Sequence, residues 1–148
     1  AAPPRLITTG REVRAGTPGA ISVLGTLAAL GASWLLGFLA LVLAMIRGWL
    51  GGTVVSRALL WLPLATTLGG TAGCLIDSLL GATAQAVYYC ERCDERTESR
   101  IHTCGKRAMQ VRGWSWLTNE RVNLVSSVVG AAVAAAAVAW LARYNLRW

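Results

Sequence analysis

Three long uncharged stretches alternate with polar segments along the chain. The first runs from Ala15 to Ile46, the second runs from Ala58 to Tyr89 with Asp77 as its single charge, and the third covers 123–142. A helix of about 20 apolar residues spans the hydrocarbon core of a bilayer. The pattern therefore predicts an all-α integral membrane protein, a single membrane domain over 1–148 with three transmembrane helices at about 21–45, 58–87 and 123–142.

The second stretch is too long for one straight crossing. At about 1.5 Å per residue, an unbroken helix over 58–89 would be far longer than a bilayer core. Pro63 and the Gly69-Gly70 pair are the places where such a helix can break or bend. A plain long helix that is tilted in the membrane is the alternative.

Small and polar residues recur at every fourth position of each expected helix. The rows are Gly69, Gly73, Asp77, Gly81 and Gln85 in the second stretch, Gly25, Ala29, Ser33 and Gly37 in the first, and Ser126, Gly130 and Ala134 in the third. Such rows form inclined ridges that let membrane helices approach closely and hydrogen-bond. We therefore expect tight helix packing.

Asp77 is the one carboxylate, and the one charged residue, in the middle of these apolar stretches. A carboxylate at membrane depth is rare, faces protein or water, and indicates a functional site by default. The alternative is a neutral or hydrogen-bonded Asp that only joins helices.

Composition and charge agree with a membrane protein. Hydrophobic residues make up 55% of the chain and charged residues 14%, against about 25% charged in soluble domains. The net charge of +7 does not indicate nucleic-acid binding, because the basic residues are spread between the apolar stretches. The N-terminus lacks the layout of a signal peptide, so we expect a processed chain or a fragment of a longer protein.

The distribution of Lys and Arg predicts the orientation. Three arginines precede the first span and seven basic residues lie in the polar segment 90–121, whereas the other side has only Arg47, Arg57, Arg143 and Arg147. By the positive-inside rule, the N-terminus and the long loop face the matrix, stroma or cytosol. We expect an inner or envelope membrane of a mitochondrion or chloroplast.

The extramembrane loop 90–121 contains four possible metal ligands, spaced as Cys90-x2-Cys93-x8-His102-x-Cys104. Three thiols and one imidazole match the Cys3His set of structural zinc sites, which leave the metal no open position for catalysis. A redox or disulfide role is weaker, because three cysteines cannot all pair and the expected side is reducing. Unliganded residues in a solvated loop are the third alternative.

Four sequence elements together resemble one known family. They are PRLITTGREVRAGTPGAIS at 4–22, GTAGCLIDSLLGATAQ at 70–85, the YYCERC and HTCG pieces of the loop, and WLTNERVNLVSS at 116–127. They are similar to the transmembrane protein 19-like family, which includes the plant phytyl-phosphate kinase of tocopherol synthesis. The resemblance covers nearly the whole chain, which looks like the C-terminal half of such an enzyme.

The resemblance implies a membrane-embedded part of a prenyl-phosphate kinase, which transfers a phosphoryl group from a nucleoside triphosphate to an isoprenoid monophosphate with Mg²⁺. Carried over by motif, the site residues are Asp77, Ser78 and Gln85 in one motif and Asn119 and Asn123 in another. Phosphate would be held by basic residues outside the membrane, of which Arg5, Arg11, Lys106 and Arg107 are the candidates.

Two departures from the family pattern leave the enzymatic reading open. No upstream acidic motif of the Gly-Asp-Thr-Trp type is present, and Thr118 stands where many members have Asp. The alternative is a non-catalytic accessory subunit of a large organellar membrane complex of the respiratory, ATP synthase or photosynthetic kind. The expected partners are a separate N-terminal half or other membrane subunits, with lipids or isoprenoids. A transporter is a third and weaker interpretation, from the broken-helix pattern.

Overall fold

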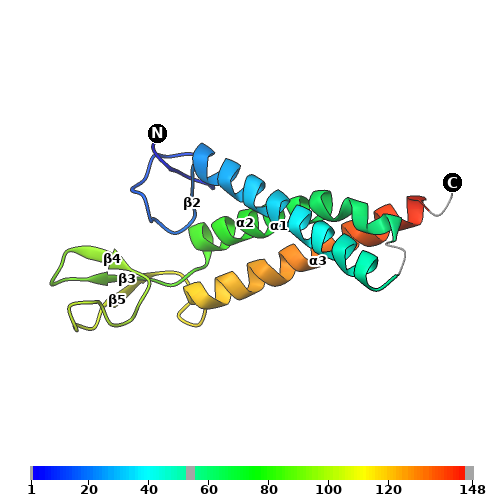
Figure 1. Ribbon diagram of the computed structural model, residues 1–148. Helices are drawn as coiled ribbons and strands as arrows, with labels where there is room; N and C mark the ends of the chain where they lie inside the picture. The colour runs from blue at the N-terminus through cyan, green and yellow to red at the C-terminus, as the bar shows by residue number, and fades with distance from the viewer. Residues whose placement is uncertain (1, 53–55, 146–148) are drawn as a thin grey trace. The chain divides into compact units, whose positions relative to one another are not determined.

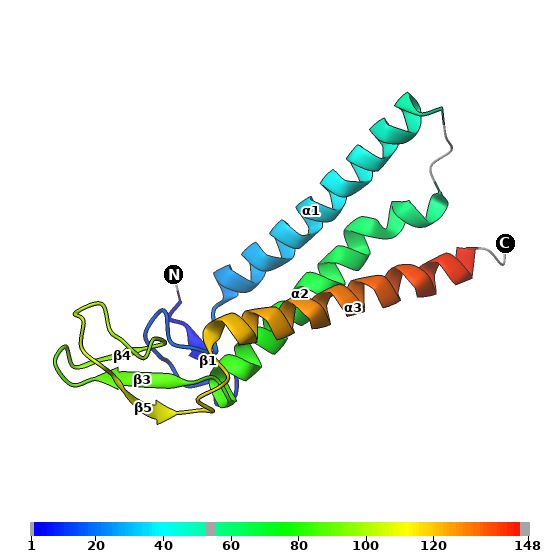
Figure 2. The same ribbon diagram turned by 90° about the horizontal axis from the view of Figure 1, so that it is seen from below.

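The computed structural model describes residues 2–52 and 56–145, and it is mostly helical. In chain order the elements are β1 (Arg5–Leu6), β2 (Ala20–Ile21), α1 (Val23–Leu50), η1 (Arg57–Trp61), α2 (Leu62–Thr83), β3 (Val87–Cys90), β4 (Glu95–Thr97), β5 (Met109–Arg112) and α3 (Asn119–Asn145). Figure 1 labels all of them except β1, which is labelled in Figure 2, and η1. Three helices are long and apolar enough to cross a membrane, at Val23–Leu50, Arg57–Thr83 and Asn119–Arg143. The prediction of three spanning helices is confirmed. Arg147, counted above for orientation, lies outside the described residues.

The surfaces of the long helices are those of membrane spans. Leu24 is 69% exposed and Leu36 is 65% exposed on α1, and Leu124 is 65% exposed on α3. In water such rows of exposed leucines would be a large apolar patch. Facing lipid tails they carry no such cost, because the tails are as apolar as the side chains.

The chain divides into two compact units, which are described separately. The first unit comprises residues 1–22 and 77–125, and the second comprises 23–76 and 126–148. Helices α2 and α3 each contribute to both.

In the second unit, α1 packs against the start of α2 through small residues. A Cβ added at Gly37 would lie 2.0 Å from Thr66 Oγ1 and 2.7 Å from Pro63 Cα, and one at Gly70 would lie 2.1 Å from Ser33 Oγ. Thr66 Oγ1 lies 3.0 Å from the Ser33 carbonyl oxygen and donates across the pair. The predicted ridge of the first helix is therefore a contact surface.

Helices α2 and α3 approach each other equally closely within this unit. A Cβ at Gly69 would lie 2.5 Å from the carbonyl oxygen of Gly130, and one at Gly73 would lie 3.0 Å from that of Ser126. Backbone meets backbone at these positions, so only glycine fits. The predicted ridges of the second and third helices are confirmed as a packing seam.

The second apolar stretch changes geometry at its start instead of at its glycines. Ser56 caps the 3₁₀ turn η1 by accepting from the Ala58 amide at 3.3 Å. Pro63 then falls in the first turn of α2, where a missing N–H costs nothing. The α-helix continues through Gly69 and Gly70 and ends at Thr83, so 84–87 of the expected span form a turn and the start of β3.

The first unit contains a β-sheet in the polar segment 90–121 that the sequence did not predict. The polar segment expected as a loop folds into a three-stranded antiparallel sheet with order β4-β3-β5, visible in Figure 2. Its buried core is formed by Ala86, Tyr88, Cys90 and Ala108, with Cys104 packed against it. At the N-terminus, β1 pairs antiparallel with β2, Arg5 opposite Ile21.

Candidate functional site

Two short hairpins of the first unit present the four predicted metal ligands. Cys90 ends β3 and pairs with Glu95, the first residue of β4, so Cys93 lies in the intervening turn. Asp94 adopts a positive φ of 54° in this turn and accepts a hydrogen bond from the Tyr89 hydroxyl.

The second hairpin is closed by a bridge between Ile101 and Arg107. The His102 amide donates to the Lys106 carbonyl at 2.9 Å, and the Gly105 amide donates to the His102 carbonyl at 2.8 Å. Gly105 has φ +78°, a conformation that favours glycine. The tight turn places Cys104 beside His102.

The structure brings the four ligands together. One ligand atom from each of Cys90, Cys93, His102 and Cys104 lies within 4.8 Å of the others. The Sγ atoms of Cys90 and Cys104 are 3.7 Å apart, and His102 Nδ1 is 3.3 Å from Cys104 Sγ. Tetrahedral zinc, with zinc–sulfur bonds of about 2.3 Å, places its sulfurs about 3.8 Å apart. The four residues are therefore close enough together to hold a metal ion. We call it the Cys3His centre.

Electrostatics within the Cys3His centre favour one thiolate. His102 and the backbone at Lys106 hydrogen-bond to Cys104 and lower the pKa of its thiol to about 6. The neighbouring Cys104 sulfur in turn raises the pKa of Cys93 to about 11. Negative charge is therefore favoured on the Cys104 sulfur, and a bound metal ion would replace the protons of the other thiols.

Glu95 is a neighbour of this centre that the sequence analysis missed. Its Oε2 lies 3.8 Å from His102 Nε2, on the side of the ring opposite Cys104. This distance is longer than a hydrogen bond, so Glu95 is a near neighbour of the outer ring nitrogen of His102. Only the β3–β4 register, which sets Glu95 opposite Cys90, shows that this residue lies beside the centre.

A second polar group, which we call the amide–carboxylate cluster, joins the two family motifs. The side-chain nitrogen of Gln85 donates to Glu98 Oε1 at 3.0 Å and lies 3.5 Å from Asn119 Oδ1. Gln85 is only 2% exposed, just beyond the end of α2, and Asn119 begins α3. The sequence analysis singled out Gln85 and Asn119 but missed Glu98, which no motif or spacing marked.

The C-terminal end of α2 is held tightly in the first unit. The Arg112 guanidinium donates to the Gly81 carbonyl oxygen at 2.6 Å, and the Trp114 amide donates to the Ala84 carbonyl at 2.9 Å. A cation at a helix C-terminus meets the negative end of its dipole. Partial burial lowers the pKa of Arg112, which stays charged.

Glycines bring two other segments against the same helix end. A Cβ at Gly113, where φ is +77°, would lie 1.9 Å from the Gln85 carbonyl oxygen, and one at Gly19 would lie 2.3 Å from the Ala82 nitrogen. The N-terminal segment and the β5–α3 connection therefore both pack directly on the end of α2.

The remaining motif residues lie in the same unit. Ser78 is buried and Asp77 is half-buried, about one turn of α2 before Gly81, and Asn123 is exposed one turn after Asn119. A hydrogen bond joins Gln85 to Asn119, and the assembly of Asp77, Ser78 and Asn123 into one site with them stays a prediction.

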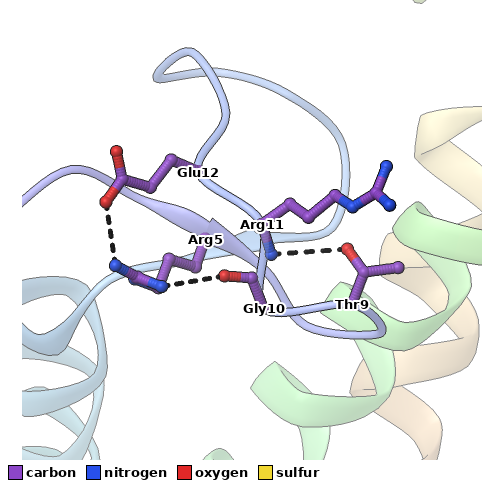
Figure 3. Close-up of polar contacts among 5 residues, drawn as sticks. All are labelled: Arg5, Thr9, Gly10, Arg11 and Glu12. Atoms are coloured by element: carbon purple, nitrogen blue, oxygen red, sulfur yellow. Dashed lines mark hydrogen bonds and ion pairs between the residues drawn. The ribbon is translucent and has the colours of Figure 1, made fainter.

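The basic candidates for phosphate binding divide into two places. Arg5 is engaged, with its guanidinium 2.8 Å from Glu12 Oε1 and 3.1 Å from the Gly10 carbonyl oxygen. The Arg11 backbone amide bonds to Thr9, and its side chain extends away from the Arg5–Glu12 pair (Figure 3). Lys106 and Arg107 belong to the second metal hairpin.

These features define an integral membrane protein with three spanning helices and an extramembrane Cys3His hairpin pair. The chain belongs to the family described as integral membrane protein DUF92, which matches residues 1–131. No solved structure shows significant similarity to it.

Similar proteins come from plants, cyanobacteria and archaea. The chain is 36% identical to Protein PGR of Arabidopsis thaliana over 84% of this chain and 42% of that protein. It is 32% identical to an uncharacterized membrane protein of Synechocystis, over 87% of this chain and 35% of that protein. The chain is also 32% identical to an uncharacterized membrane protein of Methanocaldococcus jannaschii, over 86% of this chain and 37% of that protein. The chain thus spans about two fifths of the length of these relatives.

Proposed function

We propose that this chain is a membrane-embedded part of a prenyl-phosphate kinase-like protein. The supporting observation is that Gln85 and Asn119, from separate family motifs, meet in a hydrogen-bonded cluster with a carboxylate. Helix packing alone would not require a buried amide bonded to an exposed acid. The substrate class, a nucleoside triphosphate with an isoprenoid monophosphate, comes from the resemblance described above.

The chemistry of the donor set suits phosphoryl transfer. That reaction depends on positioning and on neutralising charge on the transferred group. Asp77 supplies a carboxylate on α2 and Asn119 supplies an amide oxygen at the start of α3, and both are hard ligands of the kind that Mg²⁺ prefers. Mg²⁺, when bound, would neutralise phosphate oxygens, and of the two N-terminal arginines we propose Arg11 as the phosphate ligand, because Arg5 already pairs with Glu12.

We propose further that the Cys3His centre holds a structural zinc ion. Four protein ligands fill a tetrahedral shell, so the ion clips the hairpins together and takes no part in the reaction. The N-terminus and this centre would face the matrix, stroma or cytosol of an organellar membrane, the more basic side.

An accessory subunit of a large organellar complex is the second candidate. The exposed leucines of α1 and α3, such as Leu36 and Leu124, support it, because helices of other membrane subunits could pack on them. The relatives extend well beyond the matched region, so we propose that catalysis also needs that remaining region, in the same or a separate chain.

The two candidates are separated in native membranes. The protein is deleted from its own cells, wild type or Asp77→Asn is restored, and phosphoryl transfer from a labelled nucleoside triphosphate to a prenyl monophosphate is measured. Kinase function predicts transfer with wild type and loss with Asp77→Asn. The control is Cys74→Ala, an exposed residue one turn away on α2, which should retain transfer. A native gel that places the protein in a far larger assembly, with no change in transfer on deletion, would favour the accessory role.

A further inference from the structure

Two oxygen atoms from different elements converge on the side-chain nitrogen of Gln85. Glu98 Oε1 lies 3.0 Å away and Asn119 Oδ1 lies 3.5 Å away. Gln85 is buried, whereas Glu98 is exposed. One carboxylate oxygen is therefore held in place while the group as a whole stays accessible to a ligand.

The chain around Glu98 is fixed on both sides. Glu98 directly follows β4, and the Ser99 amide donates to Thr97 Oγ1 at 3.2 Å. Two residues later, Arg100 donates to the Tyr88 hydroxyl at 3.2 Å and to the Ser115 carbonyl at 3.0 Å. These bonds tie the segment to β3 and to the connection that leads into α3.

The Cys3His centre closes this same segment. Cys90 and Cys93 precede Glu98, and His102 and Cys104 follow it, so an ion bound by all four joins the two ends of the segment. Binding of a metal to a loop that must be ordered contributes directly to ordering it.

We propose that Glu98 is a second carboxylate of the phosphoryl-transfer site, one that binds a divalent cation and is positioned by the Cys3His centre. The role of Glu98 in phosphoryl transfer rests on the proposed function, and its location rests on the amide–carboxylate cluster. Sequence analysis found a single carboxylate, Asp77, among the motif residues, which is few for a Mg²⁺ nucleotide site. Glu98, which lies outside the helices, and the Asn119 amide oxygen at the start of α3 supply hard oxygen ligands.

The test measures binding of Mn²⁺ alone, as a probe for Mg²⁺, to zinc-loaded protein. The electron paramagnetic resonance signal of free Mn²⁺ reports how much of the ion is bound. Glu98→Gln keeps an oxygen acceptor for Gln85 but removes the charge, so the fold should persist. We expect Mn²⁺ binding to weaken by about tenfold or more, as for the loss of one charged contact. Zinc content should not change. The control variant is Glu91→Gln, an exposed residue of the Cys93 turn, which should bind Mn²⁺ like wild type.

Equal Mn²⁺ affinity of wild type and Glu98→Gln, or no binding to wild type, would overturn the inference. Its positioning part is tested by Cys93→Ser, which should lower zinc content, weaken Mn²⁺ binding and speed hydrogen exchange at residues 94–101. Unchanged Mn²⁺ affinity in the zinc-depleted variant would contradict that part. Absence of prenyl-phosphate transfer by wild type would remove the kinase proposal but not the cation site.

Discussion

The glycine seam between α2 and α3 allows a quantitative test of the membrane fold. In Gly69→Ala the new Cβ would lie 2.5 Å from the Gly130 carbonyl oxygen and 2.7 Å from Ala134 Cβ, whereas ordinary contacts begin at 3.4 Å. The helices must therefore separate by about 1 Å at the crossing, and overpacking of this kind costs about 1–3 kcal/mol.

A matched control lies on α1. Gly31 has nothing within 4 Å of an added Cβ, so Gly31→Ala should gain up to about 1 kcal/mol of helix propensity. Both substitutions have the same intrinsic helix effect, and their difference isolates the clash. We expect Gly69→Ala to be less stable than Gly31→Ala by about 1–3 kcal/mol.

The assay is unfolding of the purified protein in mild detergent by titration with sodium dodecyl sulfate, with tryptophan fluorescence as the signal. Gly130→Ala should behave like Gly69→Ala, because its Cβ would lie 2.8 Å from the Gly69 carbonyl oxygen. The variant with both substitutions should lose less stability than the sum of the two single losses, since both changes open the same helix crossing. Equal stability of Gly69→Ala and Gly31→Ala would refute the seam.

Three further results are expected from the first unit. Metal analysis should find about one zinc per chain. The Cys104→Ser variant should lose this zinc, and the control variant Cys74→Ser should keep it. A metal-free yet fully folded wild-type protein would contradict a structural zinc in the Cys3His centre. The pKa of the Cys104 thiol is lowered from its usual value of 9.0 to about 6, so its thiolate stabilises the folded state fully above pH 9. This stabilisation and the metal affinity should both fall as the pH drops from 9 towards 6. A metal affinity that stays constant over this range would count against thiolate ligation. Arg112→Met should destabilise the first unit by about 1–2 kcal/mol, since the Gly81 carbonyl loses a charged donor at the α2 C-terminus. Equal free energies of unfolding of Arg112→Met and Arg107→Met would show that this contact is unimportant.

The sequence predicted the membrane helices and their contact rows because both depend on local pattern. Runs without charge give the spans, and a repeat of four places Gly69 and Gly73 on one inclined row. The pattern could not say which helix faces which row, because that choice depends on backbone contacts between segments far apart in the chain, such as Gly69 with Gly130.

The ligands of the Cys3His centre were also visible in the sequence, since metal sites use few residue types at short spacings. Their neighbours were not. Glu95 and Glu98 are two of several acidic residues in a charged segment, and only the β3–β4 register and the bond to Gln85 distinguish them. The sheet was missed because its strands have three or four residues each, too short for a clear alternation of polar and apolar positions.

Transfer of a labelled phosphoryl group to a prenyl monophosphate, measured in native membranes, tests the proposed function most directly. Membranes that lack the protein should lose the activity, wild type should restore it, and Asp77→Asn should not. Equal transfer with and without the protein, or full restoration by Asp77→Asn, would contradict the assignment of these motif residues to phosphoryl transfer.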